Sequence, residues 1–142
     1  MARITINLPE SFPFYTRIPV RITDLNYGGH VGNDKILSLI HEARAQFLAH
    51  FGFTEKQFAG TGLIMSDVAI VFKNELFYGD AVDIAVAVTE MTRISFDMVY
   101  LLEKRVDNKV ETVAQAKTQM VCYDYERKKI SAVPEEGKKV KS

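Results

Sequence analysis

Apolar residues recur through residues 33–51 with the spacing of one helix face. They are Ile36, Leu39, Ile40, Ala43, Phe47 and Phe51. Side chains three and four positions apart lie on the same side of a helix, so this stripe predicts one amphipathic helix packed on another element. Asn33 or Asp34 is a suitable N-cap, and Gly52 suits the position just after the last helical residue.

Most of the remaining chain alternates apolar and polar residues, which is the period of β-strands. Residues 18–23 form a short run of this kind before the helix. Four longer runs follow it, at residues 63–75, 81–91, 93–105 and 110–124. This order predicts an α+β domain in which a curved antiparallel sheet of about five strands wraps a single long helix. Such long strands in one domain also predict a sheet that continues into a second copy of the chain.

Three shorter segments carry weaker patterns. Residues 3–8 alternate only in part, and nearby prolines suit an edge or irregular strand. Thr54 and Gln57 have capping-box spacing and predict a helical turn near residues 55–59. The polar, Lys-rich residues after Pro134 predict a loose tail.

The length and charge of the chain limit the number of domains and the kinds of partner that it can have. The chain has 142 residues, which predicts a single domain over residues 1–142. Its 18 basic and 18 acidic residues cancel, which argues against nucleic acid and against an anionic membrane surface as partners. No apolar run approaches the roughly 20 residues of a membrane span. A single cysteine, Cys122, and no signal-peptide pattern in residues 1–16 predict a cytoplasmic location.

Chemically active residues concentrate in residues 24–34, between the first strand and the helix. This segment reads Asp-Leu-Asn-Tyr-Gly-Gly-His-Val-Gly-Asn-Asp. Glycines allow tight turns and leave backbone N–H groups uncovered. A polar turn that leads into a helix start is a suitable place to hold an anion or a developing oxyanion.

This segment resembles hotdog-fold thioesterases of the 4-hydroxybenzoyl-CoA thioesterase type. That family carries a pattern like Asp-x-Asp-x-x-Gly-His-Val-Asn-Asn at this place. The matching residues here are Asp24, Asn26, Gly29, His30, Val31, Gly32 and Asn33. Weaker matches follow: His-Glu-Ala-Arg at residues 41–44, Phe72, Phe-Tyr-Gly-Asp at residues 77–80, and Arg-Ile-Ser-Phe at residues 93–96.

The resemblance implies hydrolysis of an acyl thioester of coenzyme A or acyl-carrier protein. Coenzyme A would enter as part of the substrate, with no separate cofactor, and the protein would be a homo-oligomer, a dimer or a tetramer. Two differences bear on mechanism. The family's second Asp, which attacks the thioester or directs water, is Asn26 here, and the first Asn of its Asn-Asn pair is Gly32. An amide cannot act as a general base.

Chemical roles follow for the residues of the turn. The Asn33 N–H, at the helix start, is expected to bond the thioester oxygen, a role that the family gives to this position. His30 can take a proton from water or give one to the thiolate, and its alternative is to pin the turn. Asp24 either orients His30 or organises the loop, and Asn26 positions water or the carbonyl.

Other residues complete the candidate site. Glu42 and Asp67 are the candidate carboxylates that could replace the missing base. A solvated helix face is the alternative for Glu42, and Asp67 is expected to face the active-site cleft of the partner subunit. Tyr27 and Gly29 are candidate substrate contacts. Arg93 and Ser95, with Lys104 and Arg105, are candidates for the coenzyme A phosphates. The spacing of His41, Glu42 and His50 matches no metal site, so no metal is expected.

Two other functions stay open. Asp24, Asn26 and His30 resemble the Asp-x-Asn-Pro-x-His motif of hotdog enoyl-CoA hydratases, but with one extra residue and no proline. The absence of the usual Asp also allows a protein that binds acyl-CoA without catalysis. The many apolar and aromatic residues favour a fatty or aromatic acyl group over a charged one.

Overall fold

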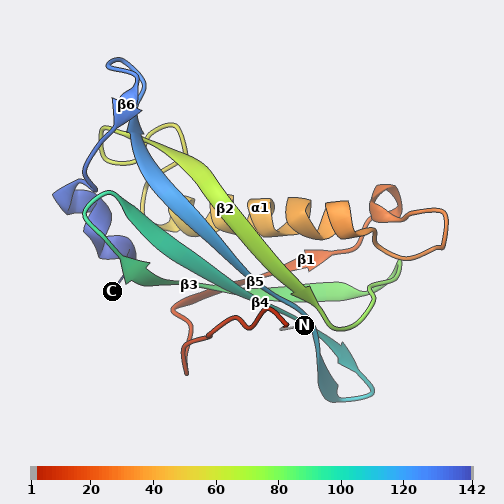
Figure 1. The fold of residues 1–142 in the computed structure, drawn as a ribbon. Coiled ribbons are helices and arrows are strands. Elements are labelled where there is room, and N and C mark those ends of the chain that lie inside the picture. Colours follow the sequence, from red (N-terminus) through yellow and green to blue (C-terminus); the bar gives the residue numbers. More distant parts are fainter. Residues whose placement is uncertain (1–2, 142) are drawn as a thin grey trace.

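A single helix lies against one face of a curved sheet in the computed structural model, which describes residues 3–141 (Figure 1). In chain order the elements are β1 (Phe14–Pro19), the 3-10 turn η1 (Ile22–Asp24), α1 (Asn33–His50), β2 (Gly62–Phe72), β3 (Ala81–Met91), β4 (Ser95–Val106), β5 (Lys109–Asp124), β6 (Lys129–Ile130) and the 3-10 helix η2 (Glu135–Lys141).

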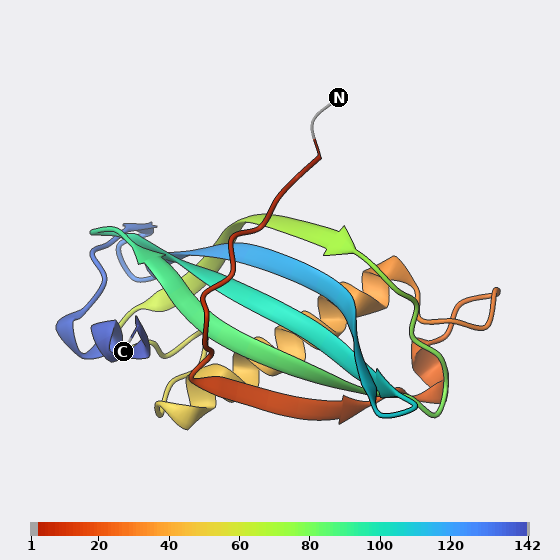
Figure 2. The ribbon, with the colours of Figure 1, turned by 90° about the horizontal axis from the view of Figure 1, so that it is seen from below.

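The strands form one antiparallel sheet in the order β1-β3-β4-β5-β2, and the short β6 pairs with β5. The sheet curves around α1, as the view from below also shows (Figure 2). The predicted α+β class, with one helix wrapped by an antiparallel sheet, is therefore confirmed. The four long strands lie within a few residues of their predicted positions.

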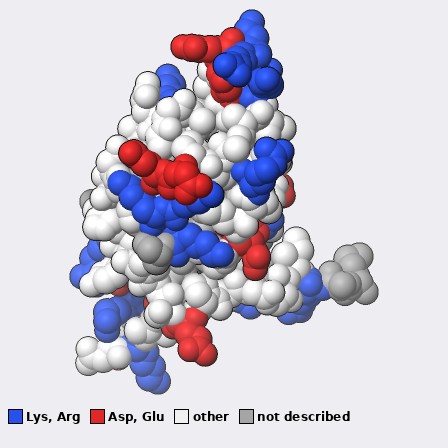
Figure 3. Space-filling model, turned by 90° about the vertical axis from the view of Figure 1, so that its left-hand side faces the viewer, with Lys and Arg blue, Asp and Glu red and all other residues white. Residues whose placement is uncertain are grey.

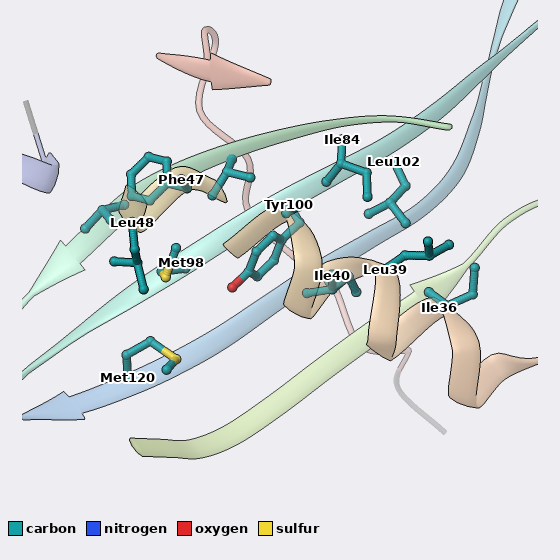
Figure 4. Close-up of a cluster of buried hydrophobic side chains, with 14 of the residues drawn as sticks. Ile36, Leu39, Ile40, Phe47, Leu48, Ile84, Met98, Tyr100, Leu102 and Met120 are labelled. Carbon is teal, nitrogen blue, oxygen red and sulfur yellow. The ribbon is translucent and has the colours of Figure 1, made fainter. Parts of the chain in front are cut away.

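The core lies between α1 and the concave face of the sheet (Figure 4). The predicted helix stripe supplies the fully buried Ile40, Ala43 and Phe47. On β4, the alternate residues Phe96, Met98, Tyr100 and Leu102 are all fully buried. Each large apolar side chain buried in this way contributes about 1.5–3 kcal/mol. The apolar stripe of α1 and the apolar face of each strand lie on facing surfaces. The spacing of the apolar residues therefore determines which face of the sheet α1 covers.

Both ends of α1 are set by glycines. Gly32, rather than Asn33 or Asp34, is the N-cap, and it gives no side-chain capping bond. Gly52 ends the helix as predicted, with a φ of +84° that suits glycine. The N–H of Phe53 then returns to the Leu48 carbonyl at 2.9 Å. The start of the helix consequently lacks the side-chain cap that the sequence predicted.

The first strand begins and ends earlier than predicted. β1 covers Phe14–Pro19, whereas Ile22–Asp24 form η1, and Ile22 is 65 % exposed. The cause is local: a carboxylate oxygen of Asp24 accepts the Arg21 N–H at 2.8 Å. This local hydrogen bond replaces the bond that the Arg21 N–H would make to a neighbouring strand, and the chain turns at this point.

Three further predictions were wrong. Residues 3–8 form no strand and run across the outer face of the sheet (Figure 2). Residues 55–59 form no helical turn: the Thr54 N–H donates to the Gln57 carbonyl at 3.1 Å, in the direction opposite to that of helical hydrogen bonds. The segment after Pro134 is not loose: it forms η2, whose Val140 is fully buried.

The surface mixes both signs of charge. Figure 3 shows the end of the molecule that carries η2, where basic and acidic side chains lie next to each other. One such pair joins Lys138 Nζ to a Glu135 carboxylate oxygen at 2.8 Å. Within residues 3–141, α1 and the other helices are too short or too polar to cross a membrane.

Candidate active site

The turn between η1 and α1 is organised by Asn26. Its side-chain Oδ1 accepts the Gly28 N–H at 2.8 Å and the His30 N–H at 3.4 Å. Its backbone N–H donates to the His30 carbonyl at 2.8 Å, and its carbonyl accepts the Gly29 N–H at 3.1 Å. Gly29 has a φ of +80°, which explains a glycine there. The Asn26 amide oxygen is therefore engaged within the turn, and only its Nδ2 is left to face a ligand.

His30 lies between this turn and the loop that joins β2 to β3. Its Nδ1 is 3.2 Å from the Val31 carbonyl oxygen. Its Nε2 is 3.9 Å from Oε1 of Glu75. The backbones are also joined, since His30 bridges to Phe77 and the Val31 N–H donates to the Leu76 carbonyl at 2.8 Å. His30 thus both pins the turn and keeps one ring nitrogen toward a carboxylate.

Two hollows lie beside the turn. One, of about 340 Å³, is lined in part by Asp24, Asn26 and Tyr27. The other, of about 210 Å³, is lined in part by His30, Asn33 and Phe72 of the β2 end. The structure therefore brings His30 and Asn33 together, whereas Asn26 lines the neighbouring hollow.

The second hollow meets the start of α1. Asn33 is the first residue of the helix. Its N–H and that of Asp34 have no intrahelical acceptor, whereas the Lys35 N–H donates to the Gly32 carbonyl at 3.0 Å. The N-cap Gly32 has no side chain that could accept from them. The partial positive charge of the helix start is shared between the Asp34 carboxylate of the first turn and a ligand at this place.

Asp24 is a structural carboxylate. It is only 2 % exposed, and it accepts from the Arg21 N–H at 2.8 Å and from Nη2 at 3.2 Å. Burial works to raise the pKa of Asp24, but these bonds from Arg21 outweigh it, so the pKa lies below its ordinary value. No bond joins Asp24 to His30 within the described residues, which leaves the loop-organising role.

The two carboxylates expected to replace the missing base lie elsewhere in this chain. Glu42 follows Asn33 by nine residues, which at 100° per residue places it on the opposite helix face. It accepts from Gln46 Nε2 at 2.7 Å and lines a hollow toward β1. Asp67 pairs with Lys117 Nζ at 2.8 Å. Because Thr118 next to Lys117 is buried against the core, Lys117 and Asp67 lie on the outer sheet face.

The candidate substrate contacts divide between the two ends of the sheet. Tyr27, on the turn, is fully exposed. Arg93 and Ser95 lie at the start of β4, whereas the turn approaches the β4 end near Lys104. Ser95 and Lys104 are nine positions apart along the strand, about 30 Å. Ser95 is 5 % exposed and bonded to Thr92 Oγ1 at 2.7 Å. Within one chain, Arg93 and Ser95 therefore do not join the turn.

Sequence reasoning missed Glu75 and expected a different role for Lys104. Glu75 lies on the β2–β3 loop, where the sequence has no helical or strand periodicity. The one sequence signal for it was its position between two segments, Phe72 and residues 77–80, that resemble the family pattern. Lys104 was expected to bind phosphate. It is 8 % exposed, donates to the Glu75 carbonyl at 2.6 Å and lies 5.2 Å from the centre of the Phe77 ring. Lys104 therefore anchors the loop that carries Glu75.

Among residues 3–141 there is no cluster of three or more His, Cys, Asp or Glu side chains that could hold a metal ion. Burial raises the pKa of the Cys122 thiol, and a bond from Thr61 only partly opposes this. Cys122 is consequently a small buried apolar group, as predicted.

The fold and this turn agree with one family. Residues 20–140 match the family model described as the thioesterase-like superfamily, and the chain belongs to it. A curated relative from Aquifex aeolicus (strain VF5), named "Putative esterase", is 26 % identical over 126 residues, covering 87 % of this chain and 94 % of the relative.

Solved structures agree in fold. A 4-hydroxybenzoyl-CoA thioesterase, solved as an Asp-to-Asn mutant complexed with 4-hydroxybenzoyl-CoA, superposes with a TM-score of 0.82 at 19 % identity, over 91 % of this chain and 98 % of that one. A 1,4-dihydroxy-2-naphthoyl-CoA thioesterase from Synechocystis gives 0.80 at 19 % identity, over 89 % and 93 %. The chain has the hotdog fold of these enzymes.

Proposed function

We propose that this protein hydrolyses an acyl thioester, of coenzyme A or of acyl-carrier protein, to a free acid and a thiol. The observation that carries the proposal is the hollow at the uncapped start of α1, lined by His30 and Asn33. It offers an N–H donor for a carbonyl oxygen beside a group that can exchange protons. Family membership and the acyl-CoA substrates named for similar structures support the same class.

The Asn33 N–H is the proposed oxyanion donor. Charge develops on the thioester oxygen as water attacks, and a donor fixed at a helix start needs no reorganisation to meet it. Removal of one such donor in other acyl-transfer enzymes costs about 10²–10³-fold in kcat.

The proposal includes a second subunit. β2 lies at the edge of the sheet, and its exposed residues include Ile64, Met65, Val68 and Phe72. An apolar edge strand is a template for pairing with another strand. Pairing of two β2 edges would make a homodimer with a continuous sheet, and the pantetheine arm would run between the subunits. In such a dimer, Arg93 and Ser95 of one subunit would contact the substrate only at the turn of the other subunit.

A panel of thioesters tests the activity. Wild-type protein is assayed with acetyl-, hexanoyl-, decanoyl-, palmitoyl- and benzoyl-CoA and with a decanoyl-carrier protein, and free thiol is measured. We expect turnover with at least one aromatic or fatty thioester. Tight binding of these ligands without thiol release would identify a non-catalytic binder. Hydration of a 2-enoyl-CoA without thiol release would identify a hydratase.

The residue at position 26 has its own test. Asn26→Asp keeps an oxygen for the Gly28 and His30 N–H groups, so the turn is retained while a carboxylate is added. We expect this variant to raise turnover of the best thioester, because a positioned base contributes about 10²–10⁴-fold. Asn26→Ser serves as the control that adds no carboxylate. An Asn26→Asp variant no faster than wild type would show that residue 26 is not the chemical centre.

A further inference from the structure

The hollow beside His30 contains a carboxylate of its own. Of the residues that line it, His30, Asn33 and Glu75 carry groups suited to acyl transfer, and Glu75 is the one acidic residue among them in the part of the chain described. The Glu75 side chain is 61 % exposed, so it can meet both solvent and a ligand. This carboxylate comes from the β2–β3 loop, not from the turn or the helix.

The spacing between Glu75 and His30 suits one water molecule. The Val31 carbonyl can only accept a hydrogen bond, so the proton on a neutral His30 ring is assigned to Nδ1, which lies 3.2 Å away. Nε2 then presents a lone pair 3.9 Å from Oε1 of Glu75. Two acceptors at this distance do not bond each other directly. A water about 2.8 Å from each can donate one hydrogen to each of them.

The backbone on both sides of the pair is fixed. The Val31 N–H donates to the Leu76 carbonyl at 2.8 Å, next to both residues in sequence. The buried Lys104 donates to the carbonyl of Glu75 itself at 2.6 Å. Lys104 also pairs with Asp80, on the far side of the same loop, at 3.5 Å. The loop that carries Glu75 is therefore held against the turn that carries His30, as a water site requires.

We propose that Glu75 and His30 together hold the attacking water, and that Glu75 supplies the carboxylate that Asn26 does not. The water oxygen bonds to the thioester carbon while its proton passes to Nε2 of His30. The Glu75 carboxylate keeps the second hydrogen and offsets the charge of the imidazolium. When the C–S bond breaks, His30 returns the proton to the sulfur, so that acid and thiol leave and both side chains are restored. This inference rests on the proposed function.

The test compares kcat and KM with the fastest thioester of the panel. Glu75→Gln keeps the size of the side chain and removes its charge. We expect kcat to fall about 10- to 100-fold with KM changed less than twofold, because the side chain holds water and not the acyl or pantetheine arm. A merely structural role would not produce this split. Glu126→Gln, on the exposed β5–β6 hairpin, is the matched control and should retain wild-type kinetics.

Two outcomes overturn the inference. One is a Glu75→Gln variant whose kcat stays within twofold of wild type, and the other is a variant whose loss appears in KM alone. Both differ from failure of the proposed function, in which the wild-type protein itself releases no thiol. Thermal melting of both variants checks the fold. The melting temperature should be retained, because the one ion pair of the Glu75 side chain within residues 3–141 is the 3.9 Å approach to His30.

Discussion

Asp24 shows how a single carboxylate can shape the entrance to the site. Its oxygens hold the Arg21 backbone and side chain, and this ends the first strand and starts the turn. The pKa of Asp24 is lowered by these bonds, against the effect of burial. A group with a lowered pKa in the folded state adds stability above its unfolded pKa of about 3.9. That contribution disappears as pH falls through the folded value.

Asp24→Asn is accordingly expected to destabilise the protein at pH 7 by about 1 kcal/mol, the typical net value of a hydrogen bond. The loss should shrink as pH falls below about 4, because the carboxylate of the unfolded wild-type chain takes up a proton there before that of the folded protein does. Urea unfolding at pH 7 and pH 3.5 measures the difference. Asp107→Asn, on the exposed β4–β5 hairpin, is the control. A destabilisation that is the same at both pH values would contradict the role assigned to the charge.

The sequence predicted the residues of the turn better than their partners. His30 and Asn33 were both identified from residues 24–34, and they do share a hollow. The sequence also predicted loop organisation as one of two roles for Asp24. Glu75 is 45 positions from His30, on a loop without periodicity, so only the folded chain brings them together. Long-range contacts between loops are the part of a site that spacing cannot reveal.

At the scale of elements, α1 carries a buried cation on its apolar side. Arg44 is 5 % exposed, and its Nε donates to a Glu55 carboxylate oxygen at 2.5 Å. Its Nη1 lies 3.4 Å from the hydroxyl of Tyr100, which pairs with Thr118 Oγ1 at 2.7 Å. Burial works to lower the pKa of Arg44, but Tyr100 and Glu55 outweigh it and raise the value. The network joins α1 to β4 and β5.

Glu55→Gln should destabilise the fold by about 3 kcal/mol, because the buried Arg44 guanidinium loses its counter-charge. Chemical denaturation measures the change. The double variant Arg44→Met with Glu55→Gln should lose less than Glu55→Gln alone, since no uncompensated charge then stays in the core. Equal losses in the single and double variants would show that the charge is not the cause.

Element patterns predicted the architecture because period and burial coincide. On β4, Phe96, Met98, Tyr100 and Leu102 recur at every second position and are all fully buried, so the strand and its inner face followed directly, although Val99 on the other face is buried as well. The first strand was misplaced because the bond from Arg21 to Asp24 overrides the alternation of residues 18–23. The C-terminal segment was misjudged because composition alone did not reveal the buried Val140.

For the whole molecule, the apolar β2 edge leads to a testable oligomeric state. We expect wild-type protein to sediment as a dimer at micromolar concentration. Val68→Lys should shift it to monomer, because a charge on an edge strand opposes pairing. Val110→Lys, at a 52 % exposed position on the β4–β5 hairpin, should leave the dimer intact. A monomeric wild-type protein would refute the proposed interface.

The hydrogen bond from the Val31 N–H to the Leu76 carbonyl has a consequence for motion. The amides of mobile loops ordinarily exchange readily with solvent, but this one can open only when the turn separates from the β2–β3 loop. Deuterium uptake at Val31 should therefore be slow for a residue outside helix and strand, and Lys104→Met should speed it by releasing the other loop. A fast exchange at Val31 in the wild type would mean that the loops part readily. If the turn and the β2–β3 loop separate in one motion, that motion would control both the entry of substrate and the positioning of His30.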